Sequence, residues 1–192
     1  VCRTDPDAGH RGFSLIVLER GMKGFERGRN LNKLGMHAQD TAELFFDNVE
    51  VPAENVLGDP GQGFMYLTHN LAQERFGMAI GAVAVARAAL RWTLDYTRER
   101  TAFGQSIASF QNSKFLLAEL HTEVQMAQAY VDRCLELHCE GKLSVEQAAA
   151  AKFITTELQN KVVDRCLQLH GGYGYMVEYP IARAWADSRI QT

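Results

Sequence analysis

The stretch Gln73-Glu-Arg-Phe-Gly-Met-Ala-Ile-Gly-Ala-Val-Ala-Val-Ala-Arg87 lies inside a long proline-free segment whose apolar residues recur at helical spacing. This segment, residues 64–99, predicts a helix of about 50 Å at a rise of about 1.5 Å per residue. Glu74, Gly77 and Gly81 share one face of that helix, which leaves room for a flat ligand or for a second helix. Close packing of a second helix is the more common reason for such a small-residue stripe.

Two further long helices are expected after this one. The first runs from Ile107 to Glu140, and the second begins at Ser144, which forms the capping-box pattern S-x-x-Q with Gln147. The second helix ends near Gly171-Gly172, and Pro180 marks a turn into a final, shorter helix. Long helices joined by short connections pack as antiparallel neighbours, so this half of the chain predicts a helical bundle.

Strand signals are concentrated before the turn cluster Gly58-Asp-Pro-Gly-Gln-Gly63. The runs Phe13-Ser-Leu-Ile-Val-Leu18 and Leu44-Phe-Phe-Asp-Asn-Val-Glu-Val51 predict antiparallel strands, separated by a glycine-punctuated stretch. The expected fold class is therefore α+β and mostly α. Residues 1–60 are assigned to part of an antiparallel β domain, and residues 61–192 to an up-down helical bundle that is truncated at its end.

Composition narrows the possible functions. The 192 residues are 46% hydrophobic and 22% charged, which is typical of a packed soluble protein and not of a disordered chain. Twenty Lys and Arg against 23 Asp and Glu give a net charge of −3, so nucleic acid is not expected as a partner. The longest apolar run, Met78 to Ala86, is shorter than the roughly 20 residues of a membrane span, so none is expected.

The cysteine pattern indicates the compartment of the protein, and the first residues suggest that the chain is part of a longer protein. Four cysteines without a C-x-x-C pair indicate a reducing, intracellular compartment. Cys134 and His138 are one helical turn apart, but no second ligand pair has suitable spacing, so no metal site is expected. Because the chain opens on Val1 in what reads as the exit of a strand, we expect a part of a longer protein.

Two segments at helix ends leave alternatives open. Arg100, in Arg98-Glu-Arg-Thr-Ala-Phe-Gly-Gln105, either satisfies the last helix carbonyls or clamps a phosphate. The segment Gln168-Leu-His-Gly-Gly-Tyr-Gly-Tyr-Met176 contains G-G-x-G but follows a helix, which excludes the dinucleotide-binding βαβ motif. Its glycines are expected to end the helix, and they also allow a ligand to approach the backbone closely.

Taken together, these motifs resemble the acyl-CoA dehydrogenase family. The segments Gly21-Met-Lys-Gly-Phe25 and Lys33-Leu-Gly-Met-His-Ala-Gln-Asp-Thr-Ala-Glu-Leu-Phe-Phe46 resemble its middle β domain. The segments that resemble its helical domain are Gln73-Glu-Arg75, Arg100-Thr-Ala-Phe-Gly104, Phe110-Gln111, Ala118-Glu-Leu120, Glu157-Leu-Gln-Asn160, Gln168-Leu-His-Gly-Gly-Tyr-Gly-Tyr175 and Glu178-Tyr-Pro-Ile-Ala182. They run in order over essentially the whole chain, and several look specific to the long-chain type.

The resemblance implies an FAD-dependent homo-oligomer, a dimer of dimers, that oxidises an acyl-CoA to the trans-2-enoyl-CoA in fatty-acid β-oxidation. Electron-transferring flavoprotein is the implied electron acceptor, and the bacterial cytoplasm or the mitochondrial matrix is the implied location. In the family a glutamate removes the α-proton while a hydride leaves the β-carbon for the flavin. A buried, dry site raises the pKa of a carboxylate toward neutrality and so suits it to this task.

The resemblance also assigns the site residues. In the long-chain and isovaleryl types the base lies on the long helix immediately before an arginine, which makes Glu74 the implied catalytic residue. The implied substrate-binding residues are Ala72, Gln73, Arg75, His10, Arg11 and Met65. The implied FAD-binding residues are Arg100, Gln111, Gln168, Leu169, His170, Gly171 and Gly172. In the family, the arginine and the 168–172 stretch contact the FAD of the neighbouring subunit across the dimer interface. In the family, further flavin contacts come from segments before residue 1 and after Thr192, so these residues alone are expected to bind FAD poorly.

Three alternatives remain open on the sequence. Two are enzymes of the same superfamily: a branched-chain, isovaleryl-type dehydrogenase, which shares the helix base, and an acyl-CoA oxidase that uses dioxygen. The third belongs to another class, a non-catalytic helical module that keeps only the part of the family fold that forms oligomers.

Overall fold

The computed structural model describes all 192 residues, which form two compact units. The first unit contains Val1–Lys33 and His37–Leu71, and the second contains Leu34–Met36 and Ala72–Thr192. The fold class is α+β and mostly helical, as the sequence predicts.

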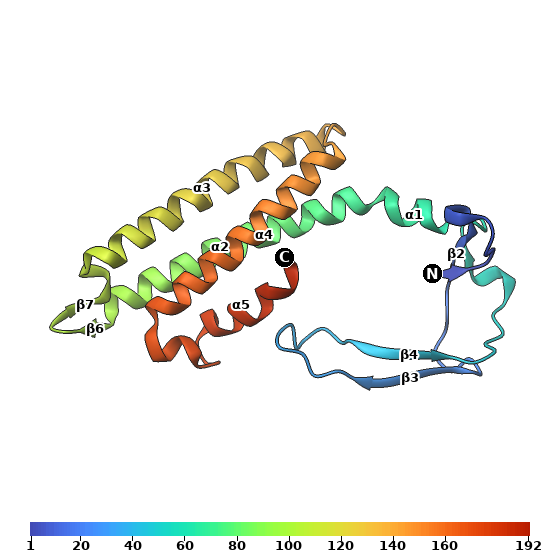
Figure 1. Cartoon of the computed structure of the whole chain (residues 1–192), viewed down its shortest axis with the longest axis horizontal. Coiled ribbons are helices and arrows are strands. Elements are labelled where there is room, and N and C mark those ends of the chain that lie inside the picture. The colour runs from blue at the N-terminus through green and yellow to red at the C-terminus, as the bar shows by residue number, and fades with distance from the viewer. The chain divides into compact units, whose positions relative to one another are not determined.

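The first unit is built from short antiparallel strands (Figure 1). A three-stranded sheet has the order β1-β2-β5, with β1 at Cys2–Arg3, β2 at Phe13–Ile16 and β5 at Val56–Leu57. A separate hairpin pairs β3, Phe25–Asn30, with β4, Ala42–Phe46. The remaining elements are the 3-10 turns Gly9–Gly12 and Ala53–Asn55 and the helix α1, Gly63–His69.

Ser14 of β2 connects three segments of the first unit through hydrogen bonds. It is fully buried, and its Oγ lies 2.8 Å from Thr4 Oγ1 and accepts a 2.9 Å hydrogen bond from the backbone N–H of Gly61. Helix α1 begins against the same strand at Gly63, where a Cβ would lie 2.9 Å from the carbonyl oxygen of Phe13. Only glycine allows this close approach, so Gly63 fixes where α1 starts.

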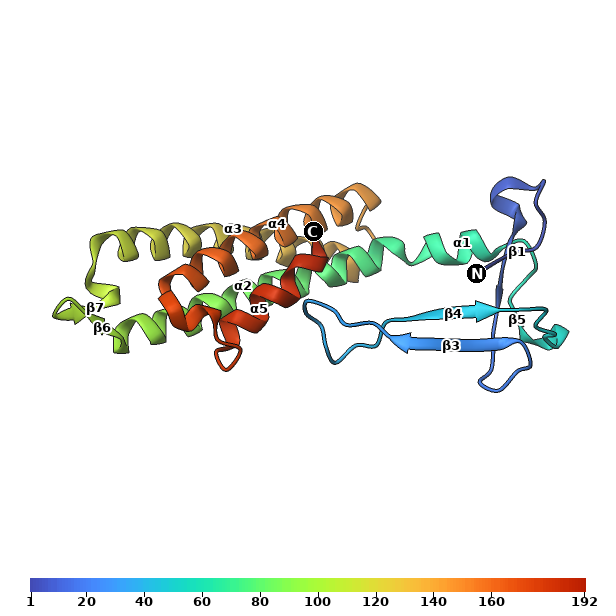
Figure 2. The same cartoon turned by 60° about the horizontal axis from the view of Figure 1, so that its bottom comes forward.

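The second unit contains the long helices. Its elements are α2, Leu71–Glu99; the hairpin β6–β7, Thr101–Ala102 and Gln105–Ser106; the 3-10 turn Ile107–Ser109; α3, Gln111–Cys139; α4, Val145–Leu169; the 3-10 turn Gly171–Tyr175; α5, Pro180–Ser188; and the 3-10 turn Arg189–Gln191. Figures 1 and 2 both show α3 and α4 side by side, joined at one end and running in opposite directions. This is the arrangement expected of long helices with short connections.

Two core clusters hold α2, α3, α4 and α5 together. The first consists of Phe76, Ala79, Val83, Ala127, Val131, Cys134, Ala148 and Ala151. The second consists of Ala86, Ala89, Leu120, Val124, Val162, Val163, Cys166 and Ile181. Alanine supplies six of these sixteen side chains, so neighbouring helices can approach closely.

Two local signals explain where helices begin and turn back. Ser144 Oγ accepts a 3.2 Å hydrogen bond from the N–H of Gln147, whose side chain accepts a 3.0 Å bond from the N–H of Ser144, which confirms the capping box. In the β6–β7 hairpin, Phe103 and Gly104 have φ values of 52° and 80°. Two consecutive positive φ angles are typical of the tight turns that match the twist of a hairpin.

The structure differs from the sequence-based prediction at three places. The expected continuous helix 64–99 is interrupted at Asn70, because Thr68 Oγ1 bonds back to the carbonyls of the preceding turn and Asn disfavours helix interiors. The glycine-rich stretch between the two predicted strands forms β3. The second expected helix starts at Gln111 instead of Ile107, because residues 107–109 make a 3-10 turn.

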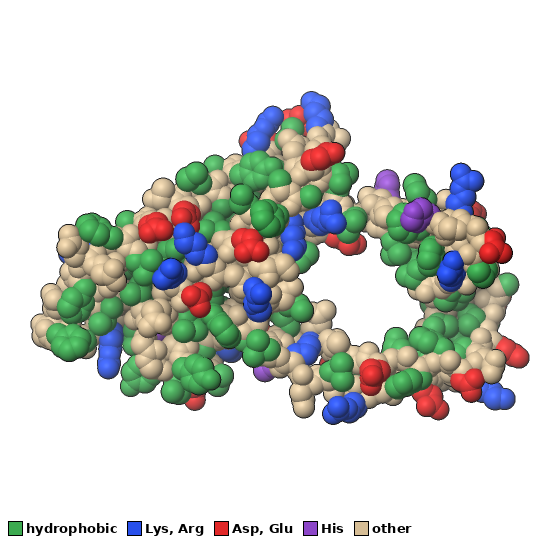
Figure 3. Space-filling model, in the orientation of Figure 1, with side chains coloured by type: hydrophobic (Ala, Val, Ile, Leu, Met, Phe, Trp, Pro, Cys, Tyr) green, Lys and Arg blue, Asp and Glu red, His purple; other side chains and the backbone are tan.

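Two surface properties bear on possible partners. On the face shown in Figure 3, acidic and basic side chains of the helical unit are interspersed and do not gather into one charged patch. The stretch Gly63–Glu99 is long and apolar enough to cross a membrane by length and composition, with a window of mean hydropathy 1.2. This is weak support for a membrane span, since the core helix of a soluble protein passes the same test.

Candidate functional site

Glu74 projects from the exposed face of α2, so the buried, dry site that the resemblance implies for the base is not formed by these residues. The buried residues of this part of the helix are Phe76, Ala79 and Val83, which lie about half a turn around the axis from Glu74. Gly77 and Gly81 are exposed on the same side as Glu74, and a Cβ at either would meet no atom within 4 Å. The Glu74 carboxylate therefore lies beside a strip of exposed helix backbone that carries no side chains.

Three of the predicted substrate residues adjoin Glu74 in the chain. Ala72 packs against the first core cluster, whereas Gln73 is exposed and Arg75 is half-buried. Glu74 and Gln73 thus present polar groups at the surface of α2, while Ala72 faces the core.

His10, Arg11 and Met65 belong to the first unit. His10 lies in the Gly9–Gly12 turn and stacks on Phe64 of α1, with ring centroids 4.6 Å apart. Met65 follows Phe64 and is exposed, as is Arg11. The structure therefore brings His10 next to the start of α1, and the substrate contacts of all three residues remain sequence-based predictions.

Five of the predicted FAD-binding residues line one cavity of about 410 Å³ in the helical unit. They are Arg100, Leu169, His170, Gly171 and Gly172, and the other lining residues are Tyr96, Ile107, Tyr173 and Met176. Gln111 and Gln168 do not line it. Arg100 follows α2 and the other four lie at the end of α4, so the fold brings together residues about 70 positions apart in the chain.

We name residues 169–173 the His170 turn. His170 is 4% exposed, and its Nδ1 lies 3.0 Å from the carbonyl oxygen of Cys166. Since a carbonyl only accepts, Nδ1 carries the proton in this bond. Burial lowers the pKa of His170, which keeps the ring neutral at physiological pH.

Tyr96 of α2 contacts the His170 turn through both its hydroxyl and its ring. Its hydroxyl donates a 3.1 Å hydrogen bond to the carbonyl oxygen of His170, and the two rings stack with centroids 4.2 Å apart. Burial raises the pKa of Tyr96, while the nearby charge of Arg100 opposes the shift. The hydroxyl therefore remains a protonated donor.

Arg100 supplies the cation of the cavity. It follows the last turn of α2, where a positive charge is favoured by the helix dipole, and its guanidinium lies 5.4 Å from the ring centroid of Tyr173. A guanidinium carries five N–H donors in a fixed planar arrangement that suits phosphate oxygens.

These residues fit the phosphate-bearing part of a dinucleotide cofactor. Gly171, with a φ of 58°, and Gly172 place no side chain in the cavity, and a Cβ at either would meet only open space. A cation facing an unobstructed glycine backbone suits a diphosphate, which needs donors and close approach. The arrangement of Arg100 and the two glycines therefore suits the binding of a phosphate group.

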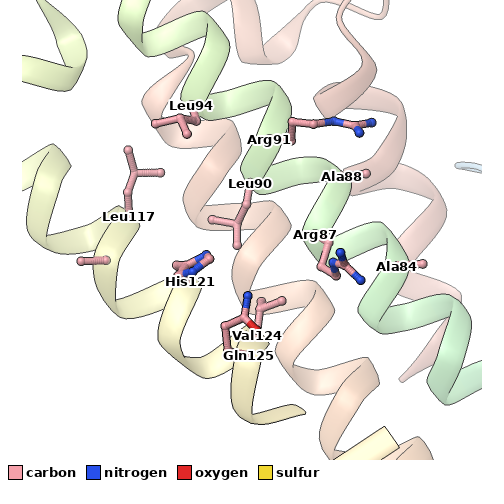
Figure 4. Close-up of a pocket in the computed structure, with 11 residues that line it drawn as sticks. Ala84, Arg87, Ala88, Leu90, Arg91, Leu94, Leu117, His121, Val124 and Gln125 are labelled. Carbon is pink, nitrogen blue, oxygen red and sulfur yellow. The ribbon is translucent and has the colours of Figure 1, made fainter. Parts of the chain in front are cut away.

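A larger hollow of about 690 Å³ lies elsewhere, between α2 and α3 (Figure 4). Leu90 and Leu94 of α2 face Leu117 and His121 of α3 across it. None of the residues predicted from the sequence lines it. Its walls combine aliphatic side chains with Arg87, Arg91 and His121.

Sequence reasoning missed Tyr96 and Tyr173. Tyr96 lies within a long helix, where an aromatic residue is most often part of the core. Its spacing of four from Arg100 was the available signal, because it places both residues on one side of α2. Tyr173 lies within the glycine-rich motif, but no sequence pattern indicates a role for its ring.

Comparisons with known proteins agree with this architecture. Residues 61–192 match the family model described as "Acyl-CoA dehydrogenase, C-terminal domain". A long-chain specific acyl-CoA dehydrogenase, mitochondrial, from Sus scrofa is 48% identical over 94% of this chain and 42% of its own length. A short-chain specific acyl-CoA dehydrogenase from Megasphaera elsdenii is 37% identical over 97% of this chain and 49% of its own length.

A solved structure is also similar. The crystal structure of an acyl-CoA dehydrogenase from Geobacillus kaustophilus superposes with a TM-score of 0.95 at 48% identity, over 99% of this chain and 50% of that one. The chain thus spans about half the length of the relatives it matches.

Proposed function

Because this chain belongs to the acyl-CoA dehydrogenase family, we propose that its protein is an FAD-dependent enzyme that oxidises an acyl-CoA thioester to the trans-2-enoyl-CoA. The observation that carries the proposal is the position of Glu74, a carboxylate immediately before an arginine, exposed above the open strip formed by Gly77 and Gly81.

Glu74 acts as the general base in this proposal. It takes the proton from the carbon next to the thioester carbonyl, and positioned general bases contribute roughly 10²–10⁴-fold to a rate. Gly77 and Gly81 leave the adjacent helix surface bare, so an acyl chain can lie along α2 beside the base. Bound FAD supplies the acceptor for the hydride that leaves the β-carbon.

The FAD-binding role is assigned to the cavity of the helical unit. Arg100 holds a phosphate of the cofactor, and Gly171 and Gly172 allow the backbone to approach it. Gln111 and Gln168 complete the predicted set as contacts outside this cavity. The contribution of these residues is affinity and placement, since none of them has to gain or lose a proton.

We favour a long-chain substrate and electron-transferring flavoprotein as the acceptor. The relative named as long-chain specific is 48% identical, against 37% for the one named as short-chain specific. A homo-oligomer, expected to be a dimer of dimers, and a mitochondrial or bacterial cytoplasmic location complete the proposal.

A chain-length series separates the enzyme alternatives. The purified FAD-loaded protein is assayed with acyl-CoA substrates from butyryl-CoA to palmitoyl-CoA and with isovaleryl-CoA. We expect the highest kcat/KM with the long straight chains, whereas a preference for isovaleryl-CoA would assign the branched-chain type. Running each assay with electron-transferring flavoprotein or with dioxygen as sole acceptor distinguishes a dehydrogenase from an oxidase. A longer protein that includes these residues but binds no FAD and oxidises none of these substrates would instead support the non-catalytic module.

A further inference from the structure

The His170 turn lacks anchors of its own at the positions closest to the predicted phosphate site. Gly171 and Gly172 carry no side chains, and both are exposed. Helix α4 has ended at Leu169, so the regular helical ladder no longer holds the backbone beyond it. The backbone N–H of His170 donates a 3.0 Å hydrogen bond to the carbonyl of Leu167, which ties the turn to α4. That bond does not set the distance between the turn and Arg100, which follows α2.

Tyr96 links the turn to α2 through two contacts of different kinds. Its hydroxyl donates to the carbonyl oxygen of His170 at 3.1 Å, and its ring stacks on the His170 ring with an interplanar angle of 17°. The Nδ1–H of His170 bonds to Cys166, so the ring on which Tyr96 packs is itself fixed to α4.

Tyr96 is also tied to the cation. It precedes Arg100 by one helical turn, and the backbone N–H of Arg100 donates a 2.8 Å hydrogen bond to the Tyr96 carbonyl. On the other side of the cavity, the Arg100 guanidinium lies over the Tyr173 ring of the same turn. The end of α2 therefore places Tyr96 one turn before Arg100, the proposed phosphate-binding residue. Tyr96 is in a position to set the distance between Arg100 and the two glycines.

We propose that Tyr96 is a positioning residue for FAD, which holds the His170 turn at the correct distance from Arg100 without touching the reacting atoms. The inference rests on the proposed function. Replacing the hydroxyl leaves the His170 carbonyl without its partner and lets the turn shift relative to Arg100. FAD affinity then falls, because the cofactor has to restore the arrangement as it binds.

The test compares Tyr96→Phe with Tyr130→Phe. Tyr130 of α3 is a matched control, since it is a half-buried tyrosine packed against the first core cluster and does not line the cavity. FAD dissociation constants are measured by titrating the apoprotein with FAD, and thermal midpoints are measured without FAD. Hydrogen–deuterium exchange of residues 169–173 reports on the turn itself.

We expect FAD binding to weaken about tenfold in Tyr96→Phe and to stay unchanged in Tyr130→Phe, since one lost hydrogen bond is worth about that factor. Exchange in residues 169–173 should rise only in Tyr96→Phe, even if both variants lose similar thermal stability. Wild-type affinity and exchange in Tyr96→Phe would overturn the inference while leaving the proposed function intact. Because these residues alone are expected to bind FAD poorly, the titration uses a longer protein that includes them, and failure of that wild-type protein to bind FAD would overturn the proposed cofactor and the inference with it.

Discussion

The Tyr96 hydroxyl donates a 3.1 Å hydrogen bond to the carbonyl oxygen of His170, a residue 74 positions later in the chain. This bond joins the end of α2 to the turn that follows α4, at the cavity where Arg100 and the glycine backbone face a common space. The local structure around Tyr96 thus connects the packing of the helices to the proposed binding of a phosphate-bearing cofactor.

The buried His170 makes stability depend on pH. Burial lowers its pKa below the ordinary value of 6.5, so the unfolded chain binds a proton at higher pH than the folded chain does. The free energy of unfolding should therefore fall as pH drops through about 6.5 toward the lower folded-state pKa. The groups that face His170 are the rings of Tyr96 and Tyr179, and Arg100 lines the same cavity.

Urea unfolding measures the free energy of unfolding at about pH 8 and at about pH 5.5. Histidine is the side chain that ordinarily titrates between these two pH values. His170→Phe keeps an aromatic ring in the stack and removes the titrating group, and His37→Phe serves as the exposed control. The wild type and His37→Phe should lose more stability at the lower pH than His170→Phe. Equal losses in all three proteins would exclude His170 as the source.

Substitutions of Gly81 should separate stability from substrate range. Gly81→Ala should raise the free energy of unfolding by about 0.5–1 kcal/mol, because a Cβ there meets no atom and alanine favours the helix. Gly81→Leu should also fold, but its side chain extends over the strip beside Glu74. We expect it to lower kcat/KM for palmitoyl-CoA more than for butyryl-CoA. An equal effect on both substrates would show that the acyl chain does not lie on this face of α2.

The buried pair Gln159–Ser188 should contribute to the docking of α5 on α4. Gln159 is 1% exposed and donates a 2.9 Å hydrogen bond from Nε2 to Ser188 Oγ, while its Oε1 has no partner. Ser188→Ala leaves the whole buried amide unpaired, and should cost about 1–3 kcal/mol of stability. Adding Gln159→Leu removes the unpaired group, so the double variant should lose less than the sum of the single variants. Additive losses in chemical denaturation would contradict this coupling.

The long helices could be predicted from sequence because their signals are local. The capping box at Ser144, the proline-free periodicity of residues 71–99 and the glycine turn after α4 each depend on neighbours within a few residues. The interruption at Asn70 was missed because the apolar pattern continues through it, while the backbone changes through a side-chain hydrogen bond of Thr68.

Only part of the candidate site could be predicted from the sequence. Glu74 and Arg100 could be assigned because their sequence motifs resemble those of a known family. The cavity itself could not be predicted, since it depends on tertiary packing that brings α2 against the end of α4. Tyr96 was missed for the same reason: its partner, the His170 carbonyl, carries no sequence signal at all.

The central claim is that Glu74 is the base, and single-turnover reduction of the bound flavin tests it most directly. FAD-loaded wild type, Glu74→Gln and Glu136→Gln are mixed with palmitoyl-CoA without oxygen, and the loss of flavin absorbance is followed. Glu136 is an exposed glutamate of α3 paired with Arg133, so its loss should change little. The account predicts bleaching in the wild type and Glu136→Gln and a rate at least about 10²-fold lower in Glu74→Gln. Bleaching of Glu74→Gln at the wild-type rate would contradict it.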